Sequence, residues 1–205
     1  LNVSAEVLSP PPSASAGWSE RRAAAFAERS QQQFRRRVLL QVGLCGVPAV
    51  VLFGAGQHSF SGNYFWGVLA VMMARLTLRK QPNELLCVML GLIPLMNMLR
   101  GLGLAFYNSI VVAFAFALIF YWICFPQTWR DLVQRNPMVF APTLFVVVYY
   151  VASAVTAQNY SANLRMFDCL FAMLALVLVG RHEHRLKTVL LGLMFSACAV
   201  AMCFV

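Results

Sequence analysis

Long apolar runs, separated by short polar segments, fill the chain after residue 37. A helix needs about 20 apolar residues to cross the hydrocarbon core of a bilayer, and most of the runs approach this length. They lie near Val38–Gly56, Tyr64–Leu78, Glu84–Leu99, Leu104–Cys124, Pro137–Val155, Asn163–Val179 and Lys187–Val205. The pattern therefore predicts an all-α polytopic integral membrane helical bundle of about seven transmembrane helices.

Two prolines fall inside these runs rather than between them. Pro48 lies in the first run and Pro94 in the third. Since neighbouring helices can satisfy the carbonyl groups that a proline frees, we expect each proline to kink its helix without ending it. The turn between the third and fourth runs has two candidate positions, Arg100–Gly103 and Tyr107–Ser109.

The first 37 residues have a different composition from the rest. They are polar and rich in alanine and arginine, and they end in Arg35-Arg36-Arg37. Trp18, Phe26 and Phe34 share a broad arc of a helical wheel with several arginines, which favours a helix lying on anionic headgroups. A flexible basic tail is the alternative. We therefore divide the chain into a basic cytoplasmic tail, 1–37, and a transmembrane helical domain, 38–205.

Composition and charge agree with a membrane protein. Hydrophobic residues make up 60% of the 205 residues and charged residues only 11%, which excludes an ordinary soluble domain. The net charge is +9, but the basic residues cluster between apolar runs, so we expect the lipid bilayer rather than nucleic acid as the partner. With the N-terminus in the cytoplasm, fourteen of the sixteen Lys and Arg residues fall in cytoplasmic segments, which supports that orientation.

The sequence lacks the common catalytic and metal-binding motifs. It has no Gly-rich phosphate loop, no GxSxG and no HExxH, and His182 and His184 sit in a short basic loop without a third ligand nearby. We expect neither a metal nor another cofactor. The six cysteines lie in apolar runs, where we interpret them as small buried hydrophobic residues. They are Cys45, Cys87, Cys124, Cys169, Cys198 and Cys203.

Two arginines depart from the cytoplasmic distribution. Arg100 ends the third run, and Arg165 lies about one turn into the sixth, with Asp168 three residues later on the same helical face. Both arginines are expected near the outer membrane boundary. One interpretation is a structural Arg165–Asp168 pair that offsets its own desolvation. The other is that Arg100 and Arg165 present guanidinium groups to a phosphate, which they bind in fork geometry.

The expected outer segments add neutral polar and aromatic side chains to these arginines. His58 lies in the first of them and Tyr160 in the last, and none of these segments contains a carboxylate. Such a surface suits a sugar or an anionic headgroup better than a cation. His58 is the only histidine expected on the outer side. We therefore include His58 and Tyr160 with Arg100, Arg165 and Asp168 among the candidate substrate-binding residues.

The region from Ala141 to Val205 has a distinctive order of features. An apolar span over Pro142–Ala154 precedes a short polar segment, Asn163-Leu164-Arg165 opens a Leu-rich span, and the basic turn Arg181–Lys187 leads into another span. This layout resembles the N-terminal membrane half of the O-antigen ligase and O-antigen polymerase family. The resemblance covers about a third of the chain and lies in layout rather than in a motif.

The resemblance implies a multi-pass enzyme of the bacterial inner membrane. Members of that family transfer a glycan from an undecaprenyl-diphosphate-linked donor to a lipid or glycan acceptor at the periplasmic face, without metal. Their membrane arginines hold the diphosphate, a role that would fall here to Arg100 and Arg165. A large periplasmic loop with a histidine proposed as base belongs to the family's second half and is missing from this sequence. We therefore expect the chain to continue beyond Val205.

Two other classes of membrane protein also fit the sequence. Transporters often contain helices broken by Gly or Pro at matching places in two halves, and Pro48 and Pro94 are candidates for such breaks. The Arg165–Asp168 pair would then serve a substrate anion or a proton relay. A non-catalytic scaffold subunit that packs against a catalytic partner is the third class.

Overall fold

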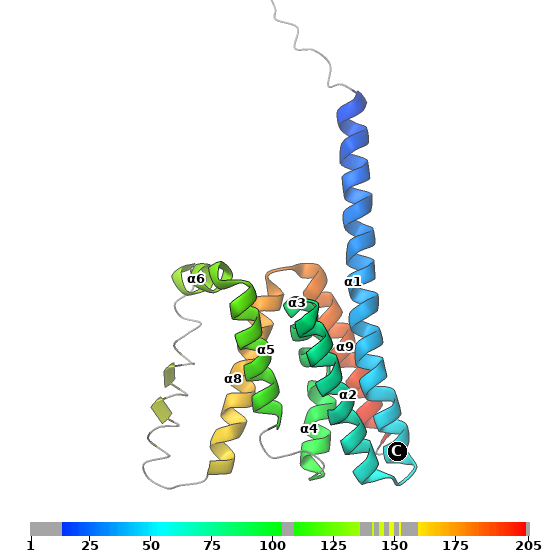
Figure 1. Ribbon diagram of the computed structural model, residues 1–205, viewed down its shortest axis with the longest axis vertical. Coiled ribbons are helices and arrows are strands. Elements are labelled where there is room, and N and C mark those ends of the chain that lie inside the picture. Colours follow the sequence, from blue (N-terminus) through cyan, green and yellow to red (C-terminus); the bar gives the residue numbers. More distant parts are fainter. Residues whose placement is uncertain are drawn as a thin grey trace, which may run out of the picture.

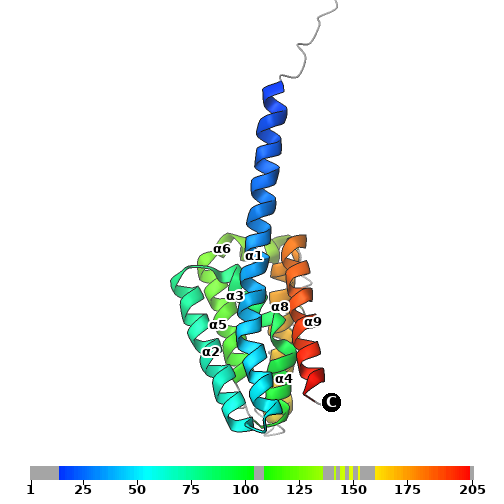
Figure 2. The same ribbon diagram turned by 90° about the vertical axis from the view of Figure 1, so that its right-hand side faces the viewer.

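The computed structural model describes residues 14–103, 109–135, 141, 144–145, 148–149, 152 and 160–203. Within these ranges, side chains are described except at 14–21, 109, 133, 135 and 160–166. The described residues form eight helices and no strand, which confirms the expected all-α class. The helices stand side by side as a bundle, from which one long helix projects (Figures 1 and 2).

The projecting helix is α1, which extends without interruption from Ala14 to Gly54. It therefore crosses the boundary that we placed at residue 37. Alanine, arginine, glutamine and glutamate are strong helix formers, so the polar half can remain helical while residues 22–33 are exposed. The apolar half begins at Val38, which is fully buried. Pro48 lies inside α1 and does not end it, as expected.

Helix α2 runs from His58 to Leu78 and returns along α1. The turn between them contains Gly56, whose φ of +77° suits a residue without a Cβ. Two side chains of α2 then bind the backbone of α1. The Ser61 hydroxyl donates to the Ala49 carbonyl at 2.6 Å, and the Tyr64 hydroxyl donates to the Leu44 carbonyl at 3.1 Å.

The third apolar run is divided into α3, Pro82–Gly91, and α4, Ile93–Gly101, whose axes differ by 51°. Pro94 is the second residue of α4. Its ring cannot donate a backbone hydrogen bond and crowds the carbonyl four residues earlier, which interrupts the helix just before it. A bend near Pro94 is found as expected, but α3 ends at Gly91 and α4 begins at Ile93, so the prediction that Pro94 would not end its helix is wrong.

The remaining described helices are α5, Ser109–Cys124; α6, Pro126–Arg135; α8, Tyr160–Gly180; and α9, Glu183–Met202. Helix α6 is bent by 101° from α5, so it runs across the end of the bundle (Figure 1). The run expected at Pro137–Val155 lies largely outside the described residues.

Among the described residues, two helices are long and apolar enough to cross a membrane, Arg22–Gly54 and Glu183–Met202. The number rises to four if each bent pair, α3 with α4 and α5 with α6, counts as one span. The described helices therefore provide two to four candidate spans and do not show the seven that the sequence predicts.

Helix α3 lies at the centre of the bundle and packs against α1, α5, α8 and α9. Its residues Glu84 to Gly91 are all buried. At Gly91 the backbones of α3 and α9 come together: an added Cβ on Gly192 of α9 would lie 3.2 Å from the Gly91 Cα. The Ser196 hydroxyl of α9 donates to the Gly91 carbonyl at 2.6 Å and ties the two helices at this level.

The connections gather at two ends of the bundle. Lys80, Phe125 and Arg185 line one cavity, which brings the α2–α3, α5–α6 and α8–α9 connections together. Gly101 and Asp168 line another cavity, which lies beside the end of α4. The segments that we expect in the cytoplasm thus share one end, and the opposite end carries Arg100.

Reporter fusions test which end faces the cytoplasm. Fusions after Arg37, Lys80, Asp131 and Arg185 should report the cytoplasm, and fusions after Ser61 and Tyr160 should report the outside, because the basic segments stay on the cytoplasmic side. A pair of reporters active on opposite sides of the membrane provides the measurement. A cytoplasmic signal after Tyr160 would contradict the orientation.

Candidate functional site

An ion pair joins α4 and α8 at the end of the bundle where α4 stops. Arg100, in the last turn of α4, donates from Nη1 to Oδ2 of Asp168, about two turns into α8. The side chains are only 16% and 13% exposed, so both charges are largely removed from solvent. A pair in such surroundings depends on mutual neutralisation, because an isolated buried charge is very costly.

This pairing differs from the one that the sequence suggested for Asp168. We considered a pair with Arg165 on the same helix, whereas Asp168 binds an arginine from a helix 68 residues earlier in the chain. Arg165 lies on α8, and its side chain is outside the described residues. One feature of the sequence could have revealed the pairing. Arg100 and Asp168 are charges of opposite sign in two apolar runs, and both were expected toward the same side of the membrane.

A cavity of about 730 Å³ opens beside the Arg100–Asp168 pair. Asn97 contributes an amide from α4, and the rest of the lining is mainly apolar. The apolar side chains are Ile93, Met96, Ile110, Phe114, Cys169 and Ala172. The cavity therefore offers a few polar groups on an apolar wall, which is the usual composition of a small-molecule site.

The second carboxylate oxygen of Asp168 is an unused acceptor next to this cavity. Oδ1 is buried and has no hydrogen-bond partner among the described residues. Leaving such an oxygen unpaired costs free energy, so it favours a ligand that brings a hydroxyl or N–H donor. The Arg100 guanidinium has five N–H donors, of which the described hydrogen bond uses one. The pair can thus accept from a hydroxyl group and donate to an anion.

The other two candidate residues lie at the first positions of their helices. His58 begins α2, where its exposed ring lies 4.4 Å, centroid to centroid, from the Phe53 ring of α1. Tyr160 begins α8, and its side chain is outside the described residues. No described contact connects His58 to the Arg100–Asp168 pair, so among the candidates the structure brings together Arg100 and Asp168.

The described residues contain no group of three His, Cys, Asp or Glu side chains that could hold a metal ion. The six cysteines are all free thiols. Cys45 and Cys87 are buried as expected and Cys124 and Cys203 are half-buried, but Cys169 and Cys198 are exposed, so the prediction of burial is wrong for these two. Cysteine is small and weakly polar, so an exposed position on an apolar helix suits it as well as the core does.

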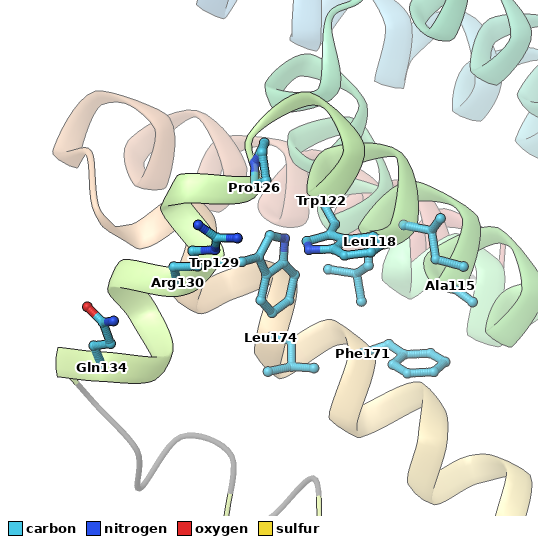
Figure 3. A pocket seen from close by; sticks show the side chains of 10 residues that line it. Ala115, Leu118, Trp122, Pro126, Trp129, Arg130, Gln134, Phe171 and Leu174 are labelled. Atoms are coloured by element: carbon cyan, nitrogen blue, oxygen red, sulfur yellow. The ribbon is translucent and has the colours of Figure 1, made fainter.

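A second cavity, of about 630 Å³, lies between α5, α6 and α8 (Figure 3). Trp122 and Trp129 stand over it, with Leu118 and Leu174 along its wall and Arg130 at its edge. It is found at the end of the bundle where α6 crosses, away from Arg100. Its lining is almost entirely apolar, so it lacks the convergent polar groups of the first cavity.

Comparison with protein-family models, curated proteins and solved structures finds no match to this chain.

Proposed function

We propose that this chain is the membrane-embedded part of a bacterial cell-surface polysaccharide ligase or polymerase in the inner membrane. It would cross the membrane about seven times and take a glycan from an undecaprenyl-diphosphate-linked donor at the periplasmic face. The acceptor would be a lipid or another glycan, and no metal would be needed. The proposal combines the layout of residues 141–205 with the site around Arg100.

The observation that carries the proposal is the Arg100–Asp168 pair beside an accessible cavity at the end opposite the basic connections. A polyprenyl diphosphate is an activated leaving group, so its transfer requires stabilisation of the growing negative charge on the diphosphate. Arg100 would donate to the diphosphate while Asp168 holds the guanidinium in position. Arg165, one turn before Asp168 on α8, would supply the second guanidinium.

Arg100 and Arg165 would have different roles, because Asp168 already balances the charge of Arg100. The Arg100 guanidinium would therefore orient a phosphate more than attract it. Oδ1 of Asp168 would accept a hydrogen bond from a hydroxyl of the glycan or acceptor. Arg165 would therefore carry most of the charge stabilisation.

Arg165→Ala tests this assignment in the natural protein expressed by its host. We expect normal protein levels, because an arginine at the membrane boundary can reach water and adds little to folding. Glycan transfer should fall by about a hundredfold, which is the usual loss when one donor to a developing anion is removed. The measurement is the ratio of transferred polysaccharide to lipid-linked precursor in membrane extracts.

Arg130→Ala is the matched control, because it removes an exposed arginine from α6 at the opposite end of the bundle. Transfer should be unchanged in this variant. Wild-type transfer by Arg165→Ala would contradict the proposal, and so would an equal loss in both variants.

A transporter is the alternative function, and one observation favours it. The break between α3 and α4 lies next to the cavity that contains the Arg100–Asp168 pair, and transporters often bind substrates where a helix is interrupted. Uptake of an anion by vesicles containing the purified protein, without any transfer of glycan to an acceptor, would support this function. A scaffold subunit would show neither activity.

A further inference from the structure

Two adjoining cavities lie at the basic end of the bundle, far from the Arg100–Asp168 pair. One has a volume of about 290 Å³ and lies between α1, the α2–α3 connection and the α8–α9 connection. The other, of about 510 Å³, lies between α1 and the start of α9. Gln31 and His184 line both, so the two cavities form one hollow surface, which we call the basic hollow.

Positive charge predominates around the basic hollow. Within the described residues, the cationic side chains at it are Arg35, Arg37, Lys80, Arg181, Arg185 and Lys187, and the carboxylates are Glu28, Glu84 and Glu183. Two of the three carboxylates are already neutralised: Arg37 binds Glu84 at 3.1 Å, and Lys187 binds Glu183 at 2.6 Å. The remaining cations thus face a single carboxylate, Glu28, and the hollow attracts anions.

Histidine adds no positive charge to this surface at neutral pH. Burial, together with the nearby Arg185, His184 and Arg181, lowers the pKa of His182 below its usual range. Because the pKa moves away from neutrality in the acidic direction, the ring is uncharged at pH 7. The charge of the basic hollow is therefore carried by guanidinium and ammonium groups.

Described contacts hold the hollow in shape. Arg185 donates from Nη1 to the Asn83 side-chain oxygen at 2.7 Å, which joins α9 to α3. The Phe34 ring meets the His184 ring edge-on at 6.0 Å, which joins α1 to α9. Lys80 has a φ of +53°, a left-handed conformation in which glycine is normally found after a helix.

The neighbouring helix α6 indicates the depth of the basic hollow in the membrane. It turns by 101° from α5, carries Trp129 and Arg130, and has a buried Leu132 on its inner face. A short amphipathic helix of this kind lies in the plane of the lipid headgroups. Phe125, where α5 meets α6, lines the smaller cavity, so the hollow lies at about the same level as α6.

We propose that the basic hollow binds the phosphate headgroup of an anionic phospholipid from the cytoplasmic leaflet. Basic pockets between helices at that face have the chemistry for such headgroups. The acyl chains would lie against the apolar part of the bundle, where the exposed side chains include Leu40, Leu44 and Leu190. The level of the hollow, close to that of α6, favours a lipid over a soluble phosphate compound. The proposal does not depend on glycan transfer.

The test measures lipid binding by the purified chain in a non-ionic detergent. Native mass spectrometry with phosphatidylglycerol and with phosphatidylcholine gives the two affinities. We expect phosphatidylglycerol to bind about tenfold more tightly, since each Lys or Arg near an anionic headgroup contributes substantially. Arg35→Gln combined with Arg181→Gln should abolish this preference. Both side chains are exposed and line the larger cavity, so their loss leaves the fold intact.

Arg22→Gln combined with Arg29→Gln is the matched control, because it removes the same charge from exposed positions of the projecting part of α1. This variant should keep the preference, as should Arg35→Lys combined with Arg181→Lys. An equal loss in the glutamine variant and the control, or no preference in the wild type, would overturn the proposal. Displacement of phosphatidylglycerol by inorganic phosphate alone would identify a soluble anion instead and would also overturn it.

Discussion

Gly192→Leu is expected to lower the stability of the bundle by about 3 kcal/mol, near the upper end of the usual range for overfilled cores. Even an added Cβ at this position would lie 3.2 Å from the Gly91 Cα, which belongs to the backbone of α3 and cannot rotate away. A leucine would force α9 away from α3 and lengthen the 2.6 Å hydrogen bond from Ser196 to the Gly91 carbonyl. The loss should appear as a lower midpoint of thermal unfolding in detergent.

Gly67→Leu is the control for this substitution. Gly67 lies inside α2, as Gly192 lies inside α9, and an added Cβ there meets nothing within 4 Å. The same change of residue type should therefore leave the unfolding midpoint almost unchanged. Similar midpoints for the two variants would show that α3 and α9 do not approach each other as closely as described.

Asp168→Ala is the second substitution with a large expected effect. It would leave the Arg100 side chain, 16% exposed, without its carboxylate partner. Removing one partner of a fully buried ion pair lowers the free energy of unfolding by about 3 to 5 kcal/mol. Because the Arg100 side chain is partly exposed, we expect a smaller loss of about 2 kcal/mol. The expected result is a lower unfolding midpoint together with loss of glycan transfer.

Arg100→Met combined with Asp168→Leu separates the structural role of the pair from its functional role. Apolar residues of similar volume often replace a buried ion pair without loss of stability, so this double variant should unfold near the wild-type temperature. It should still fail in glycan transfer, because the guanidinium and the carboxylate are both missing. If it were stable and fully active, the pair would be structural, and the functional proposal would lose its main support.

The sequence was sufficient for features that depend on neighbouring residues along one helix. The position of the bend near Pro94 follows from a missing N–H and a steric clash within one turn, although the helix is interrupted at Leu92 where only a kink was expected. The continuity of α1 was missed because we treated a change in composition at residue 37 as a change in structure. Helix propensity does not depend on polarity, so residues 14–37 continue the same helix.

The sequence did not predict the pairing of the candidate residues. Arg100 and Asp168 were singled out because charged residues are rare in apolar segments. Their contact was not foreseen, because helical periodicity relates residues three or four positions apart and says nothing about a partner 68 residues away. The basic hollow was missed for the same reason, since its side chains come from α1, the α2–α3 connection and α9.

The sequence by itself determined the helical class and the division of basic and apolar segments, because hydrogen bonding within each helix and the preference of charges for water act locally. Tertiary structure alone decided which helices became neighbours. The close approach of Gly91 and Gly192, the Arg100–Asp168 pair and the basic hollow all depend on how separate helices pack. Which helices pack together depends on how well their whole surfaces fit, and this fit cannot be read from any single stretch of sequence.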